Sequence, residues 1–129
     1  MKENYLCPHC KGSLNVDEKI VFSVRNKHGN PGLIFLHPEL GNYEAIKNES
    51  FSFEDGEHLE YRCPICHKKL ASDIHDNLAR IIYVDEANQQ FHVLFSMIAG
   101  EQSTFKMVGD NAEVYGEHTT HYLDLLGMR

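Results

Sequence analysis

The chain has 129 residues, about the length of one domain, and 19 acidic against 12 basic residues give it a formal net charge of −7. No apolar run approaches the roughly 20 residues of a membrane-spanning helix, and recurring Val, Ile, Leu, Phe and Tyr exclude a disordered chain. The acidic balance also argues against broad nucleic-acid binding, which depends on clustered Lys and Arg.

The N-terminal residues hold the first of two similar cysteine motifs. Cys7 and Cys10 are separated by Pro-His, and Cys63 and Cys66 are separated by Pro-Ile, so both stretches read C-P-x-C-x-x-x-L. The chain contains no other cysteine. Because no apolar leader precedes the first motif, we expect a cytoplasmic protein rather than an exported one.

Two residues between paired cysteines favour chelation of one metal ion by a tight turn. Both sulfurs can then face the ion while backbone N–H groups point at the sulfurs, and the Pro sets φ for the turn. Two such knuckles, residues 5–14 and 61–70, supply the four thiolates of a closed, structural zinc site. The predicted zinc ligands, which would also hold iron, are therefore Cys7, Cys10, Cys63 and Cys66.

Two other uses of the cysteines compete with a metal site. Disulfides are disfavoured by the missing export signal and by the paired spacing. Cys7 and Cys10 with their Pro-His spacer match the active-site tetrad of disulfide-oxidising proteins of the thioredoxin fold, so a thiol–disulfide redox protein is the main alternative. In that fold the motif follows strands and opens a helix, whereas here it begins at residue 7 and precedes poor helix formers.

Residues 15–60 form a long insertion between the knuckles, because ribbon-type zinc sites commonly close over about 15–20 residues. Within the insertion, residues 20–25 are predicted to be a strand, 27–32 a turn and 33–36 a short apolar run. Residues 40–47 are predicted to be a short helix or irregular, and 57–62 a strand that leads into the second knuckle.

Much of the negative charge lies in the segment 39–60, which carries seven acidic side chains against Lys47 alone. A solvated loop face is the plain interpretation of such a charge run. We also predict that this acidic segment is the surface through which the protein contacts a protein partner of basic character.

The second half is rich in predicted strands. Residues 80–84 and 90–98 flank a polar turn and indicate an antiparallel hairpin, and 103–108 and 113–115 are further strands. Apolar residues occur on both faces of 90–98, so this strand is expected to be covered on both sides. Residues 117–127 suit a short terminal helix with a Thr cap and a Gly after its last turn.

Together these elements predict a single domain, 1–129, of the α+β class and rich in strands. It has a zinc-ribbon-like knuckle pair with a long insertion, antiparallel strands over 78–116 and a short C-terminal helix. Zinc binding in small sites is worth on the order of 10 kcal/mol, and a domain has a net stability of only about 5–15 kcal/mol. We therefore expect the ion to decide whether the chain folds.

The two C-P-x-C motifs and the downstream stretch Ile82-Tyr83-Val84-Asp85 resemble the bacterial CpXC family, over about residues 5 to 110. The resemblance implies a bacterial protein with a long segment between the motifs and with the four cysteines as zinc ligands. No catalytic residue follows from it. Knuckles of this kind commonly carry Gly directly after the second Cys, where a positive φ is favoured, but Lys11 and His67 occupy those positions here.

The first half is also similar to antitoxins in which an N-terminal zinc module precedes a DNA-reading helix-turn-helix. The second half of this chain is rich in strands and carries no pair of basic helices. The similarity therefore ends at the knuckles.

Nine histidines are the remaining candidates for metal chemistry. His118 and His121 share one face of the predicted terminal helix and could bind a second ion, although an exposed polar face is the simpler interpretation. We interpret His9, His67 and His92 as structural or solvent-facing. No catalytic or cofactor-binding motif is present.

The sequence thus predicts a zinc-stabilised module that contacts another protein, and it gives no support for an enzyme. A redox protein that uses Cys7 and Cys10 is the first alternative. A zinc-ribbon module that binds nucleic acid is the second, and the net charge disfavours it.

Overall fold

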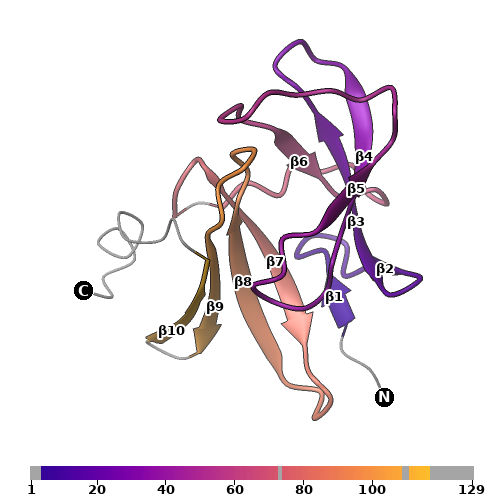
Figure 1. Ribbon diagram of the computed structural model, residues 1–129. Coiled ribbons are helices and arrows are strands. Elements are labelled where there is room, and N and C mark those ends of the chain that lie inside the picture. Colours follow the sequence, from indigo (N-terminus) through magenta and orange to yellow (C-terminus); the bar gives the residue numbers. More distant parts are fainter. Residues whose placement is uncertain (1–3, 73, 109–110, 117–129) are drawn as a thin grey trace.

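Figure 1 shows the computed structural model, which describes residues 4–72, 74–108 and 111–116. These residues form two antiparallel sheets. In chain order the strands are β1 (Asn4–Leu6), β2 (Asn15–Val16), β3 (Lys19–Arg25), β4 (Pro31–Leu36), β5 (Ala45–Lys47), β6 (Glu60–Arg62), β7 (Leu78–Val84), β8 (Gln90–Ser96), β9 (Thr104–Val108) and β10 (Asn111–Tyr115).

The first sheet has the order β1-β7-β8-β9-β10 and contains the hairpin predicted from the sequence. Strands β7 and β8 pair antiparallel, with Ile81 opposite Val93. On β8, Val93 and Phe95 face the main core, whereas Leu94 packs on the other face in a second small cluster. The prediction that this strand is covered on both sides is therefore confirmed.

The second sheet is built mainly from the insertion and has the order β2-β3-β4-β5. Strand β6 also pairs with β3, along the residues that β2 leaves open. Along β3, Ile20, Phe22 and Val24 face the core, at the two-residue period of a strand. The strand predicted over residues 20–25 is confirmed.

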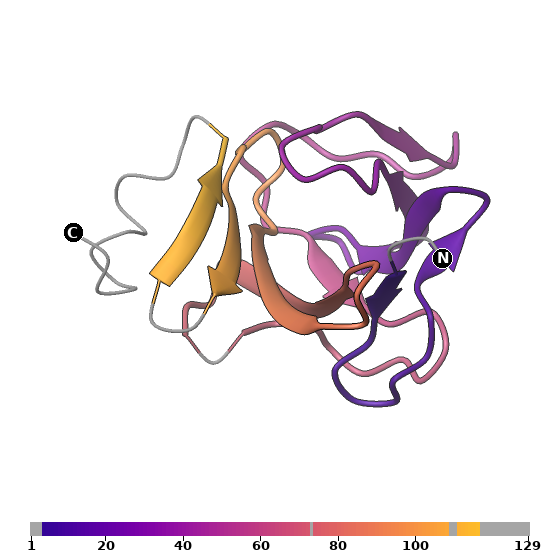
Figure 2. The same ribbon diagram turned by 90° about the horizontal axis from the view of Figure 1, so that it is seen from below.

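The two sheets pack against each other and enclose one apolar core. Seen from below in Figure 2, the β9–β10 ribbons and the strands of the insertion lie on opposite sides of the molecule. Three aromatic rings bridge the sheets: the Phe22 ring lies 5.3 Å from those of Tyr61 and Phe95, which lie 5.4 Å from each other. Rings at such separations add attraction beyond their buried area.

The predicted α+β class is wrong, because the described residues contain strands and no helix. Residues 40–47 do not form the helix that was one of two expectations for them. Gly41 adopts a φ of 90°, and residues 45–47 pair as β5 with β4, so a sheet contact outweighs local helix propensity. The predicted terminal helix, 117–127, lies outside the described residues. In the described part, the structure has no helix that could cross a membrane.

Candidate metal centre

The first knuckle follows β1 and is closed by backbone hydrogen bonds. Cys7 N donates to Gly12 O at 3.0 Å, and Lys11 N donates to Cys7 O at 2.9 Å. Leu14 N then donates to Tyr5 O at 2.7 Å, which returns the chain alongside β1. The side chains of Tyr5 and Leu14 are buried in the core, so the knuckle is anchored at both ends.

The second knuckle follows β6 and repeats this pattern residue for residue. Cys63 N donates to Lys68 O at 3.1 Å, His67 N to Cys63 O at 3.0 Å, and Leu70 N to Tyr61 O at 3.0 Å. The repeat therefore includes a tyrosine two residues before each first cysteine, so that both knuckles read Y-x-C-P-x-C-x-x-x-L. The sequence prediction missed these tyrosines, although the signal was present in the aligned motifs.

The residues that replace the expected glycines adopt the backbone conformation that glycine favours. Lys11 has a φ of 63° and His67 a φ of 66°. For residues with a Cβ this left-handed conformation costs roughly 1–2 kcal/mol. The knuckles thus keep their geometry at an energetic cost that the closed turns offset.

The four cysteine sulfurs lie together between the two knuckles, within 4.8 Å of one another. Cys7 Sγ is 3.8 Å from Cys66 Sγ, and Cys10 Sγ is 3.8 Å from Cys63 Sγ. A tetrahedral ion with bonds of about 2.3 Å to sulfur requires sulfur separations of about 3.8 Å. All four cysteines are free thiols, so the arrangement fits one metal ion and contains no disulfide.

Backbone N–H groups point at every one of these sulfurs. They would delocalise the negative charge that four thiolates bring to a divalent ion. The donors are His9 N at 3.3 Å and Cys10 N at 3.5 Å to Cys7 Sγ, Gly12 N at 3.4 Å to Cys10 Sγ, Ile65 N at 3.3 Å and Cys66 N at 3.4 Å to Cys63 Sγ, and Lys68 N to Cys66 Sγ.

The thiols of the centre differ in acidity. Burial raises the pKa of Cys7, and it raises the pKa of Cys63 to about 12. The backbone N–H of Lys68 lowers the pKa of Cys66 to about 7. Without a cation, therefore, the buried thiols keep their protons, and a metal ion that binds as a thiolate complex must displace them.

Metal affinity is expected to rise steeply with pH. At neutral pH at least Cys7 and Cys63 hold protons that the metal releases, so the apparent association constant should increase about 100-fold per pH unit. Binding is lost as the pH falls, because protons then compete for sulfur. Calorimetric titration in buffers of different ionisation enthalpy measures the proton release directly. Release of fewer than two protons per ion would contradict this account.

Position 67 tests the strain of the second knuckle. We expect His67→Gly to keep the metal and to change the free energy of unfolding by at most about 1 kcal/mol, in the stabilising direction. The branched side chain of valine disfavours a positive φ, so His67→Val should lower the free energy of unfolding by about 1–2 kcal/mol. Urea denaturation of both variants gives the comparison, and equal stabilities would show that the turn is unstrained.

None of the histidines that the structure describes joins the group of four cysteines. His9 directs Nε2 at Lys69 O, 3.1 Å away, and the side chains of His67 and His92 are exposed. The predicted pair His118 and His121 lies outside the described residues. Among the residues that the structure describes, the cysteines are the only group of three or more metal-ligating side chains close enough to share an ion.

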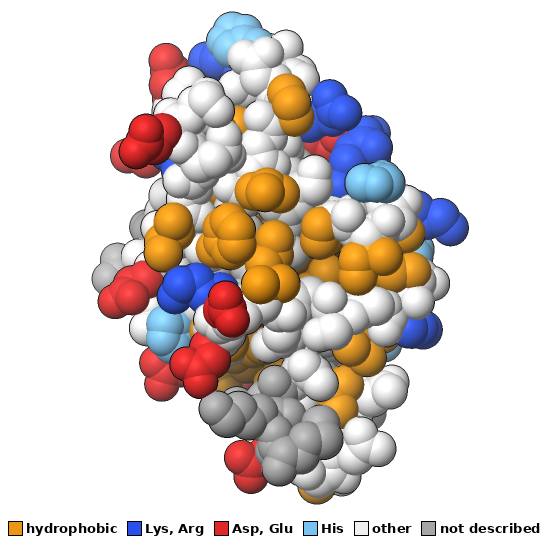
Figure 3. All heavy atoms as spheres, turned by 90° about the vertical axis from the view of Figure 1, so that its right-hand side faces the viewer, with side chains coloured by type: hydrophobic (Ala, Val, Ile, Leu, Met, Phe, Trp, Pro, Cys, Tyr) orange, Lys and Arg blue, Asp and Glu red, His pale blue; other side chains and the backbone are white. Residues whose placement is uncertain are grey.

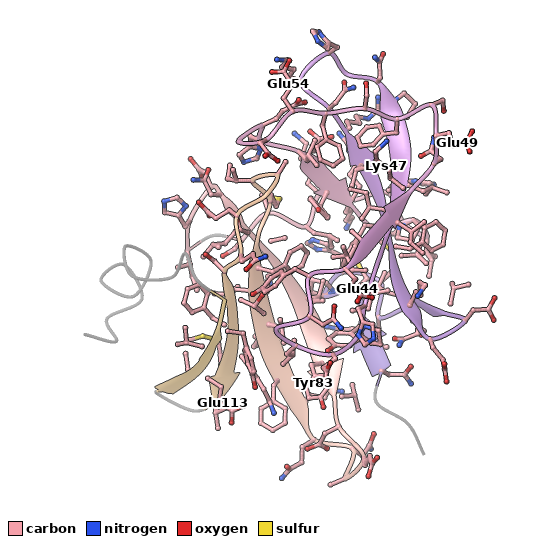
Figure 4. The ribbon with its side chains drawn as sticks, viewed as in Figure 1. Glu44, Lys47, Glu49, Glu54, Tyr83 and Glu113 are labelled. Carbon is pink, nitrogen blue, oxygen red and sulfur yellow. The ribbon has the colours of Figure 1, made fainter. Side chains whose placement is uncertain are left out.

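The acidic segment is partly used within the fold. Glu60 accepts from Arg62 Nε at 2.5 Å and lies 3.3 Å from Lys69 Nζ, and these two cations lower the pKa of its carboxyl group. Glu54 lies 3.3 Å from Lys27 Nζ. Figure 4 shows Glu44 and Glu49 at the two ends of β5 and Glu54 apart from them, so the acidic groups are spread over the insertion.

Comparisons of this chain with models of protein families, with curated proteins and with solved structures find no match. The resemblance to the CpXC family therefore stays a prediction.

Proposed function

We propose that the four cysteines form a structural zinc centre that fastens the two sheets of a non-enzymatic binding module. The convergence of the four sulfurs, at the separations of a tetrahedral complex, carries this proposal. Zinc is favoured over iron because nothing else in the chain points to electron transfer. Four protein ligands also complete the shell, which leaves no open position for a substrate.

The placement of the knuckles gives the ion a mechanical role. The first knuckle continues β1, which pairs with β7 in the first sheet, whereas the second continues β6, which pairs with β3 in the second sheet. One ion bound by both knuckles therefore cross-links the sheets through residues far apart in the chain. Such a link stabilises the fold because binding free energy at a site absent from the unfolded chain is folding free energy.

A redox role for Cys7 and Cys10 is less well supported. An attacking cysteine in such proteins is accessible and has a lowered pKa, commonly at the start of a helix. Cys7 is instead fully buried, and burial raises its pKa. It follows β1 and leads into a turn.

The proposal is tested by metal content and thiol reactivity of the purified protein. We expect one zinc ion per chain, and four thiols that react with a disulfide reagent only after a strong chelator has removed the metal. A redox pair would instead react at once and cycle with dithiothreitol. One iron per chain would change the metal but keep the structural role, whereas rapid cycling of Cys7 and Cys10 would refute it.

The partner surface that we propose is the outer face of the second sheet. Val21, Phe35 and Ile46 are cross-strand neighbours on β3, β4 and β5 and form an apolar row, and the Ile46 side chain is 56 % exposed. Figure 3 shows apolar side chains gathered across this side of the molecule. Because Glu44 and Glu49 flank the strand, the surface fits a protein segment that is apolar with a basic edge.

Site-specific photo-crosslinking in the producing cell tests this surface. Leu33 lies two residues before Phe35 on β4, on the same face, and is 41 % exposed. A crosslinker at position 46 or 33 is expected to capture one discrete protein. The same group at position 86, which is exposed in the turn between β7 and β8, serves as the control. Equal capture at all three positions would mean that the outer face is not a specific contact.

A further inference from the structure

A cavity of about 230 Å³ lies between the inner faces of the two sheets. Both sheets contribute its wall: Tyr5, Ile81 and Phe95 come from the first, and Phe22, Ile34 and Tyr61 from the second. Protein interiors are otherwise close-packed, and an apolar cavity of about 150 Å³ already accommodates benzene. The space between the sheets is therefore large enough for a small organic molecule.

The cavity combines an apolar wall with the hydroxyl of Tyr61, which comes from the second sheet. The Tyr61 side chain is only 7 % exposed, and its hydroxyl makes no hydrogen bond with any residue that the structure describes. No side-chain N or O atom in the described residues is both fully buried and unpaired, so this hydroxyl is reached by solvent, and Tyr61 lines the cavity. A molecule that fills the cavity would shield the hydroxyl from water, so a ligand that offers it a hydrogen bond is favoured over one that does not.

The aromatic rings of the wall indicate the shape of that ligand. Phe22, Tyr61 and Phe95 all line the cavity and stand at edge-to-face or tilted angles to one another. Flat aromatic molecules pack well against such rings. A cavity of about 150 Å³ holds the six non-hydrogen atoms of benzene, so in the same proportion the cavity of about 230 Å³ holds about nine such atoms.

The residues near the surface indicate the charge of the ligand. The loop that follows β4 lines the cavity on one side, and two hydrogen bonds hold it in place. The Tyr5 hydroxyl donates to Pro38 O at 2.5 Å, and the Tyr43 hydroxyl lies 2.9 Å from Thr104 Oγ1. The charged side chains that line the cavity in the described residues are Glu39 and Glu101, with no Lys or Arg. This lining disfavours an anion.

From this cavity we infer a binding site for a small, uncharged aromatic molecule with a single hydrogen-bonding group, which reaches the Tyr61 hydroxyl. The site lies between the sheets and involves none of the cysteines. It is therefore independent of the role proposed for the metal centre.

Indole is a suitable probe, because the chain contains no Trp, and excitation of indole beyond the absorption band of the six tyrosines leaves its fluorescence free of protein background. Titration of the purified full-length protein should shift the indole emission to the blue and saturate at one molecule per chain. Indole-3-acetate, which adds a carboxylate, should bind at least about tenfold more weakly. No saturable binding of indole to the folded protein would overturn the proposal.

Variants locate the binding. Val93→Phe and Ile34→Phe fill the cavity from opposite walls and should abolish the saturable shift, whereas Leu94→Met, next along β8 but facing the other cluster, should not. Tyr61→Phe should weaken indole about tenfold and leave naphthalene, which has no hydrogen-bonding group, unchanged. Metal content and thermal melting identify a variant that fails to fold. If one of the two filling variants does not fold, the result of the other shows whether indole binds in the cavity. Indole binding that survives in a folded filling variant would place it outside the cavity.

Discussion

Cys63→Ser is expected to unfold the protein. Cys63 is fully buried and lies 3.8 Å from Cys10 Sγ, so its loss removes one of four thiolates and leaves a hydroxyl among buried groups. A structural ion contributes on the order of 10 kcal/mol, comparable to the whole net stability of a domain of about 5–15 kcal/mol. Circular dichroism and zinc analysis should therefore show loss of both the cooperative melt and the bound ion.

The matched control introduces a serine into the same knuckle at a position that is not a metal ligand. Ile65→Ser changes a residue that is 55 % exposed, and it retains the backbone N–H that donates to Cys63 Sγ. This variant should bind one ion and melt cooperatively. Addition of a strong chelator to the unmodified protein should reproduce the Cys63→Ser state. A metal-free chain that still melted cooperatively would show that the ion is dispensable for folding.

Phe22→Ala is expected to cost about 3–5 kcal/mol, because it removes a fully buried ring from the contact between the sheets. Phe22 contacts both Tyr61 of the second sheet and Phe95 of the first, so its loss weakens their packing. The ring is not a metal ligand. The variant should therefore still bind one ion per chain while its urea midpoint falls.

Ile46→Ala provides the comparison for this substitution. Its side chain is exposed on β5, and in the isolated protein its removal should change stability by no more than about 0.5 kcal/mol. Denaturation with the metal bound compares the two variants. Equal effects would mean that the aromatic cluster does not hold the sheets together.

The sequence predicted the strands whose own residues carry the pattern. The apolar stretches over residues 20–25, 80–84 and 90–98 correspond to β3, β7 and β8, because burial of one or both faces of a strand requires apolar side chains within the strand itself. The spacing within the two cysteine pairs likewise predicted that all four sulfurs lie together in one cluster. In each case the information lies within a few residues of the feature that it predicts.

The features that the sequence did not predict depend on partners far along the chain. Residues 31–32, predicted as part of a turn, begin β4, and Gly32 lies so close to the Phe51 ring that a Cβ would approach within 2.3 Å of it. Phe51 is buried, yet its own neighbours give only a weak alternation. The cavity is equally invisible in the sequence, because it is defined by the distance between two sheets and not by any single strand.

The pairing of β1 with β7 has a consequence for how the chain is made. The N-terminal strand finds its neighbour only when residues 78–84 have been synthesised, and the thiols at positions 7 and 10 wait for those at 63 and 66. During synthesis, β1 and the first knuckle therefore stay without their partners while the whole insertion is added, and their two thiols stay unliganded. We expect long-range closure of this kind to make folding slow and dependent on the metal supply when the second knuckle emerges.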